Sequence, residues 1–131
     1  MIAEQIVYRM LDVPGLNALV SDRIFSSSAK QNAKPPYLVF EVLEDVSYPN
    51  LNIQEPVRHD AHVRIYALDL GQVKIGQMNE AIKSALNFKF YIVVDGKTVI
   101  ESRFKSVNPM EKDHETGIFI QATDYILRYY E

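Results

Sequence analysis

The segment FYIVVDGKTVIESRF, residues 90–104, constrains the fold more than any other part of the sequence. Two runs rich in β-branched and aromatic residues flank Asp95 and Gly96, a dipeptide that supplies the positive φ angles of a type I′ turn between antiparallel strands. Three further stretches are rich in strand-forming residues, and the first two alternate at the strand period of two: 37–46, 57–68 and 118–130. We therefore expect a mostly antiparallel or mixed sheet of about five strands.

Two other segments show the period of an α-helix. Residues 2–11 carry an apolar stripe, and Pro14 ends that helix before one more short turn. The second helix, residues 69–87, opens with Asp69 placed to accept from the backbone N–H of Gln72, as in a capping box. The apolar stripe that this helix would bury consists of Ile75, Met78, Ile82 and Leu86.

The order helix, strand, strand, helix, hairpin, strand predicts an α+β fold with both helices packed on one face of the sheet. At 131 residues, the chain is expected to form a single domain over 1–131. One layer of helix leaves the second face of the sheet uncovered, and a contiguous apolar patch there would mark a partner surface. The apolar residues that we place outside the core are Val39, Leu43, Leu68, Tyr125, Leu127 and Tyr129.

The first alternating strand is expected to keep one alternation along its whole length. Leu38 and Val42 then face the core together with Val46, and Glu44 is the one polar residue on that face. The opposite face carries Val39 and, at the far end of the strand, Asp45.

Composition and charge exclude several classes of protein. The net charge of −3 gives no overall attraction to nucleic acid or to anionic lipid, so we expect no sequence-specific nucleic-acid binding. The absence of cysteine excludes disulfides and thiolate chemistry. Glu4, Arg9 and Asp12 interrupt the N-terminal apolar stretch, unlike a signal peptide, and no window reaches the roughly 18 apolar residues of a membrane span. A cytoplasmic protein is expected.

No arrangement of residues predicts catalysis, a metal ion or a cofactor. His59 and His62 lie three apart on a strand, so their side chains point to opposite faces and cannot share a metal ion. The acidic clusters at 41–45 and 111–115 lack the two distinct environments that acid–base catalysis requires, and we interpret them as solvated charges. The sequence therefore predicts a protein that is not an enzyme.

The loop 47–56, SYPNLNIQEP, is unusually apolar for a connection between two strands. Tyr48, Leu51 and Ile53 lie between polar residues and prolines. These side chains either fold back over the core or dock on a neighbouring chain, and the sequence leaves both alternatives open.

In their order, the elements resemble a known family. The opening helix runs into LNALVSDRIF, a polar loop ends in KPPYLVFEVLED, and a strand containing HVRIYALD leads into the second helix. The prolines at the start of the second motif fix the backbone and direct the chain into a strand. This ordered set, over about residues 2–90, resembles the tail-completion, or tail-to-head joining, family of long-tailed bacteriophages and prophages.

The resemblance implies a structural protein, without catalysis or cofactor, that caps the tail tube as a ring, commonly of six copies. Its partners would be further copies of itself, the tail-tube protein and the head connector, and DNA would pass through the ring. It would assemble in the host cytoplasm and remain in the neck or tail of the virion. The loops 26–36, 47–56 and 109–117 and one sheet face would be interfaces. The candidate interface residues are Pro35, Pro36, Tyr37, Val39, Leu43, Tyr48, Leu51 and Ile53.

Two alternatives stay open beside this interpretation. A different neck or connector adaptor of phage assembly would share the same kind of interfaces but attach on the portal side. A small-ligand-binding or enzymatic α+β domain belongs to another class, and it would require a pocket in which polar groups converge.

Overall fold

A curled sheet is centred on β3 (Arg58–Asp69) and β7 (Phe119–Tyr130). In the computed structural model, which describes residues 2–30, 32–48 and 57–131, the strand order is β1-β2-β3-β7-β5-β4, and β6 pairs with β7. The pairs are antiparallel, apart from the parallel pair of β1 and β2. The remaining elements are α1 (Ile2–Leu11), α2 (Pro14–Val20), β1 (Ile24–Ser26), β2 (Tyr37–Tyr48), α3 (Gln72–Leu86), β4 (Lys89–Val94), β5 (Lys97–Val107) and β6 (Glu111–Lys112).

The predicted α+β class and the mostly antiparallel, mixed sheet are confirmed. The sheet has seven strands where about five were expected. The two unexpected strands, β1 and β6, are three and two residues long, too short to show a period of two in the sequence. The predicted hairpin turn is also confirmed, because Asp95 and Gly96 have φ angles of 52° and 79°.

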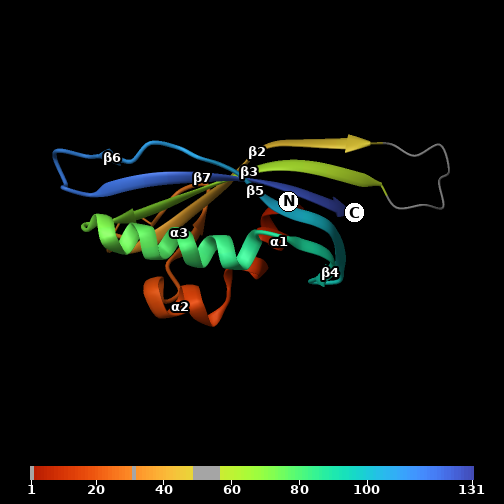
Figure 1. Cartoon of the computed structure of the whole chain (residues 1–131), viewed down its shortest axis with the longest axis horizontal. Helices are drawn as coiled ribbons and strands as arrows, with labels where there is room; N and C mark the ends of the chain where they lie inside the picture. The colour runs from red at the N-terminus through yellow and green to blue at the C-terminus, as the bar shows by residue number, and fades with distance from the viewer. Residues whose placement is uncertain (1, 31, 49–56) are drawn as a thin grey trace.

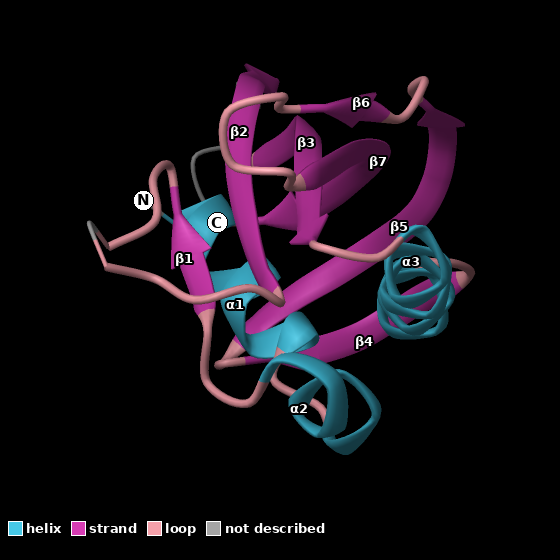
Figure 2. Ribbon diagram, turned by 90° about the vertical axis from the view of Figure 1, so that its left-hand side faces the viewer, coloured by secondary structure: helices cyan, strands magenta, loops and turns pink. Residues whose placement is uncertain are grey.

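The helices lie on one side of the sheet, with α3 along its length and α2 farthest from it (Figure 1). Seen from the end, the sheet curls, and α1 lies in the opening between β1 and β4 (Figure 2). The ends of β2 and β3 project beyond the helices, so this part of the sheet has no helix beneath it (Figure 1). Within the described residues, no helix is long and apolar enough to cross a membrane.

The core lies between the helices and the inner face of the sheet. The apolar stripe of α3 is buried as predicted, against β3 side chains such as Val63 and Ile65. Tyr125, Leu127 and Tyr129 were expected outside the core, and this prediction is wrong: all three are buried in it. Strand β7 is central, between β3 and β5, so its inward side chains lie in the middle of the molecule and not at a free edge.

A β-bulge changes the faces of β2 halfway along the strand. The register of β2 against β3 shifts between Val42 and Glu44, and the extra residue reverses the alternation after it. Val46 therefore does not share the core face with Leu38, as expected, and Asp45 turns to the inner side, where it meets Tyr129. The single alternation predicted for this strand is wrong after the bulge.

The start of α3 also differs from the prediction. The N-cap residue is Gly71, with no side-chain cap, and Asp69 lies two residues earlier, at the end of β3. The Asp69 carboxylate accepts a hydrogen bond from the Gly71 backbone N–H at 3.1 Å. Asp69 thus fixes the turn from strand to helix, and no capping box with Gln72 forms.

Candidate assembly surfaces

The outer face of the sheet, opposite the helices, changes in chemistry along its length. At one end, Tyr37, Leu68 and Ile120 lie side by side across β2, β3 and β7, and this end is apolar. Further along, the same three strands carry Glu41, Arg64 and Asp124. Towards the projecting end, the partners are Val46, Asp60, Arg128 and Glu101. The face is therefore apolar at one end and charged at the other.

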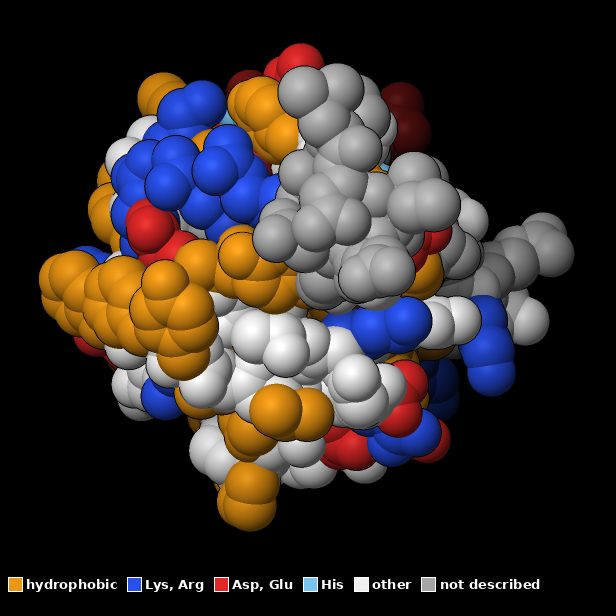
Figure 3. Space-filling view, turned by 90° about the vertical axis from the view of Figure 1, so that its right-hand side faces the viewer, with side chains coloured by type: hydrophobic (Ala, Val, Ile, Leu, Met, Phe, Trp, Pro, Cys, Tyr) orange, Lys and Arg blue, Asp and Glu red, His pale blue; other side chains and the backbone are white. Residues whose placement is uncertain are grey.

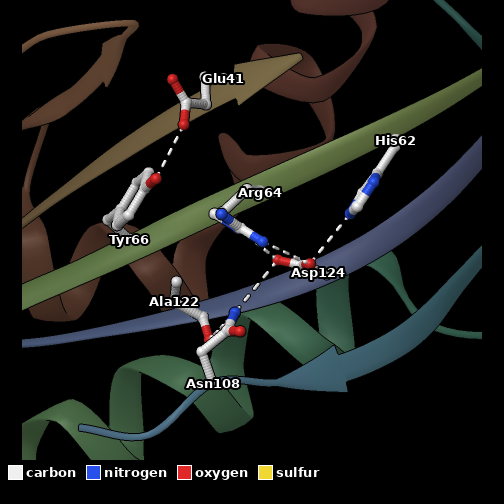
Figure 4. Close-up of polar contacts among 7 residues, drawn as sticks. All are labelled: Glu41, His62, Arg64, Tyr66, Asn108, Ala122 and Asp124. Carbon is white, nitrogen blue, oxygen red and sulfur yellow. Dashed lines mark hydrogen bonds and ion pairs between the residues drawn. The ribbon is translucent and has the colours of Figure 1, made fainter. Parts of the chain in front are cut away.

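Asp124 holds together the centre of the outer face (Figure 4). Its carboxylate accepts hydrogen bonds from Arg64 Nε at 2.9 Å, from the second Arg64 nitrogen at 3.1 Å and from His62 Nε2 at 2.9 Å. The amide of Asn108 approaches it at 3.4 Å. The Asp124 side chain is only 5% exposed, and the hydrogen bonds from Arg64 in particular lower the pKa of this carboxyl group.

Tyr66 and Glu41 form a second polar contact on this face (Figure 4). The Tyr66 hydroxyl donates to the Glu41 carboxylate at 2.8 Å. Partial burial, followed by the contact with Glu41, raises the pKa of Tyr66, so the phenol stays protonated and keeps donating at neutral pH. Glu41 is thus not the solvated charge that the sequence suggested.

Ion pairs run across the projecting end of the outer face. Asp60 lies 3.3 Å from Arg58 Nε and 3.4 Å from Arg128 Nε, which are distances at which opposite charges attract. These contacts are ion pairs without hydrogen-bond geometry, since neither Asp60 Oδ1 nor Arg128 Nε has a hydrogen-bond partner among the described residues. Glu101 continues the row, 3.6 Å from Arg128 and 2.6 Å from Arg103 Nε. Lys and Arg side chains gather beside hydrophobic ones at this end of the molecule (Figure 3). In the described part of this face, the arginines Arg58, Arg103 and Arg128 are therefore all paired with carboxylates.

A separate polar cluster lies on the inner side of the same end. His59 Nδ1 is 3.0 Å from an Asp45 oxygen and His59 Nε2 is 2.9 Å from a Glu131 oxygen, while the ring stacks on Tyr129 with centroids 5.0 Å apart. The Tyr129 hydroxyl donates to Asp45 at 2.6 Å. Burial alone would lower the pKa of His59, but the hydrogen bonds to Glu131 and Asp45 raise it overall.

The two histidines therefore point to opposite faces, as predicted: His62 lies on the outer face and His59 on the inner side. In the described part of the chain, no group of three or more His, Asp or Glu side chains is arranged to hold a metal ion. Asp45 is half-buried by its contacts with His59 and Tyr129, so the acidic cluster at 41–45 is more ordered than its sequence indicated.

The predicted interface residues do not form one patch. Pro35 and Pro36 are half-buried, the Pro36 carbonyl accepts from Arg23 Nε at 2.8 Å, and Tyr37 packs edge-on against Phe25. These contacts hold the start of β2 against β1. Val39 lies nearby on the apolar end of the outer face, opposite Tyr66.

The other predicted interface residues lie near the far end of β2. Leu43 lies in the bulge and is exposed, and Tyr48 is exposed at the end of the strand, with the Arg58 guanidinium 4.4 Å from its ring centre. Leu51 and Ile53 lie outside the described residues. The interface role of these eight side chains stays a prediction.

The most exposed apolar segment among the described residues, at 88–93, was not among the predicted interfaces. Phe88 and the β4 residues Phe90, Tyr91 and Val93 are exposed, with exposed fractions of 76% for Tyr91 and 73% for Val93. Apart from Lys89, the run FKFYIVV at 88–94 is apolar and does not alternate with polar residues. That pattern is typical of a strand covered on both faces, and it could have pointed to a partner here.

An open groove of about 870 Å³ lies beside β4, on the side of the helices. Its walls come from α1, the loop after it and the start of α2, from the second half of α3 and from β4 itself. The small residues Gly15, Ala81 and Ala85 leave room within it, Ile92 and Val94 line its strand side, and Arg9, Lys89 and Asp95 are its charged residues. This lining suits an apolar segment better than a polar metabolite, for which polar groups would have to converge.

Comparison with protein families decides what kind of protein this is. The family model described as tail completion protein gp17 matches residues 4–117. The chain belongs to this tail completion family. The match includes the helices, β1 to β6 and the whole β4–β5 hairpin. The resemblance seen in the motifs of residues 2–90 is thereby confirmed, and the chain is a structural component of a phage tail.

Solved structures agree with the fold of this tail completion protein. A chain from a structure titled "Virion of native gene transfer agent (GTA) particle" superposes with a TM-score of 0.71, at 12% sequence identity, over 95% of this chain and 92% of that one. At this identity, the likeness establishes a shared fold. No curated protein matches the sequence.

Proposed function

We propose that this tail completion protein closes the end of the phage tail tube as a ring of identical copies and joins the tube to the head connector. Membership of the tail completion family is the observation that carries the proposal. The occurrence of the same fold in a chain of a gene transfer agent virion supports a place in an assembled particle. By analogy, the chain would act in the neck or tail of its virion after assembly in the host cytoplasm.

The surface chemistry supports a part that docks and does not catalyse. The exposed apolar segment of β4 and the exposed Leu43, Val46 and Tyr48 of β2 give the chain two regions that a partner could cover. The buried charges on the sheet, Asp124 above all, have partners that hold the scaffold rigid. We infer that the protein is not an enzyme and needs no cofactor.

DNA would pass through the ring without being gripped. The chain has a net charge of −3, and Arg58, Arg64, Arg103 and Arg128 on the outer face all pair with carboxylates. Free basic side chains would bind phosphates and slow the passage of DNA. The pairing of these arginines with carboxylates and the net negative charge of the chain both weaken the binding of phosphates.

Light scattering on the purified protein tests the ring. We expect a single species with several times the 15.0 kDa mass of the chain, six times for a hexamer, alone or after addition of the tail-tube protein. A monomer under both conditions would contradict the ring. An oligomer that binds the head connector but not the tube would instead indicate a neck adaptor.

The loop 47–56 provides a second test, because Leu51 and Ile53 were predicted either to fold over the core or to dock on a neighbour. The double variant Leu51→Asp with Ile53→Asp is expected to keep its unfolding transition and to lose assembly. Loss of the fold itself, measured by circular dichroism, would assign this loop to the core.

A further inference from the structure

Two strand edges of the sheet are free in the described part of the molecule. Strand β4 pairs with β5 on one side, and no described strand pairs with its other side. Strand β2 pairs with β1 only through Leu38, Val39 and Phe40, so residues 41–48 have a described partner only in β3. An open edge presents unpaired N–H and C=O groups that can pair with a strand of another chain.

The free edge of β4 is shaped to receive an extended segment. A strand added beside β4 would place alternate side chains over the groove that Ile92 and Val94 line, where Ala81 and Ala85 leave space. The intervening side chains would lie on the outer face, beside Val93. Apolar side chains of such a segment would be covered on the groove side by Ile92 and Val94 and on the outer side by Val93.

Charge selects among the segments that could fill this site. Two basic residues, Arg9 and Lys89, and one acid, Asp95, line the groove. Neither base forms an ion pair with a described residue, whereas Glu101, on β5 opposite Phe90, is paired with Arg103 and Arg128. Residues 41–48 have the sequence EVLEDVSY, with three acidic and no basic residues. Glu41 and Asp45 already contact Tyr66 and His59, so the exposed Glu44 is the acid that remains for a partner. Their exposed apolar side chains are Leu43, Val46 and Tyr48.

We propose that residues 41–48 of one copy pair along the free edge of β4 in the next copy, so that the two sheets become continuous. The proposal rests on the self-assembly proposed above and names the surfaces that carry it. Pairing of β2 with the β2 edge of another copy is disfavoured, because it brings acidic side chains together. Two different edges that fit one another make a head-to-tail interface, which closes into a ring when the rotation between copies allows it.

Cross-linking between two singly substituted chains tests this interface. The native chain has no cysteine, so every disulfide would come from the introduced residues. Val46 and Val93 both lie on the outer face of their strands, and a disulfide requires their Cα atoms to come within about 7 Å. Chains with Glu44→Cys or Val46→Cys are mixed under mild oxidation with chains carrying Phe90→Cys or Val93→Cys, which covers different registers.

We expect a cross-linked dimer from at least one β2–β4 mixture and none from Gln77→Cys, on the exposed side of α3, mixed with Val93→Cys. When both substitutions of the productive pair are in one chain, a ladder of products should end at the ring size. If native chains form an oligomer and no β2–β4 mixture cross-links, this interface is wrong and the proposed ring survives. A native chain that stays monomeric with the tube protein and does not cross-link overturns both.

Charge reversal provides an independent measurement of the same contact. Glu44→Lys or Lys89→Glu alone is expected to raise the concentration needed for half-assembly by about tenfold, since each places like charges together. The combined variant should return to within about twofold of the native value. Lys74→Glu on α3 is the matched control for a change of charge elsewhere. Single variants that assemble like the native chain, with an unchanged unfolding transition, would contradict the pairing.

Discussion

Asp124 forms more polar contacts on the outer face than any other described side chain there. It lies on the central strand β7 and accepts hydrogen bonds from Arg64 and His62 on β3, while Asn108 approaches it from the segment after β5. Its near-complete burial strengthens these contacts and also makes an unpaired charge expensive there. The residue therefore joins three parts of the chain across the face opposite the helices.

Replacing Asp124→Asn should lower the free energy of unfolding by about 2 kcal/mol, because Arg64 and His62 lose the carboxylate that balances them. Urea unfolding at neutral pH measures the change. The exposed Glu44→Gln is the control and should change stability by less than about 0.5 kcal/mol. Equal stabilities of the two variants would show that the Asp124 cluster contributes little.

His59 should make the projecting end of the sheet sensitive to pH. Both of its ring nitrogens face carboxylate oxygens, on Asp45 and Glu131, and carboxylates only accept hydrogen bonds. A neutral imidazole has one N–H donor, so this site favours the doubly protonated ring. The raised pKa of His59 follows from that geometry.

The sign of the pH effect follows from the raised pKa of His59. The stabilisation is fully present below the unfolded pKa of 6.5 and is lost as the pH rises through the higher folded pKa. His59→Gln should therefore be destabilising at about pH 5.5 and closer to native at about pH 8.5. Urea unfolding at both values, with His114→Gln in the exposed loop as control, measures this. A His59→Gln effect that is equal at both values would contradict the assignment.

At the scale of elements, the strands and helices with strong local signals could be predicted from the sequence. The turn at Asp95-Gly96 needs positive φ angles, which this dipeptide tolerates, and the stripe Ile75 to Leu86 has the period of a buried helix face. The bulge after Val42 could not be predicted, because the sequence shows only one polar residue on the expected core face, Glu44, before Val46 resumes the apolar alternation. Its cause is tertiary: Asp45 meets His59 and Tyr129 on the inner side.

The candidate site was predicted less well than the fold. The apolar run of β4 was recognised as a strand, but exposure depends on strand order, and only the structure places β4 at an edge. Tyr125, Leu127 and Tyr129 were assigned to a surface for the same reason, although β7 is central. Strands β7 and β4 are both rich in apolar and aromatic residues in the sequence. Their positions in the sheet differ, so the side chains of β7 are buried at the centre and several of those of β4 are exposed at an edge.

Two glycines test how the elements depend on backbone conformation. Gly96 has a φ of +79° in the β4–β5 turn, Gly76 lies within α3, and a Cβ at either would meet nothing within 4 Å. Gly96→Ala should cost about 1 kcal/mol through left-handed backbone strain, whereas Gly76→Ala should stabilise by about 1 kcal/mol. Thermal unfolding compares them. A neutral Gly96→Ala would mean that the turn can relax into another conformation.

At the scale of the whole molecule, three features of the structure suit a protein that is joined to others in an assembly. The helices cover one face of the sheet, paired charges and a short apolar end make up the other, and two complementary strand edges stay open among the described residues. A protein with this arrangement gains its function from what it contacts. That agrees with its membership of a tail completion family.

Electron microscopy of particles made with and without this chain tests the central claim most directly. If the protein completes the tail and joins it to the head, a phage or prophage lacking it should yield filled heads and separate tails. Adding the purified native chain to that lysate should restore joined particles. Joined, infectious particles in the absence of the chain would contradict the account.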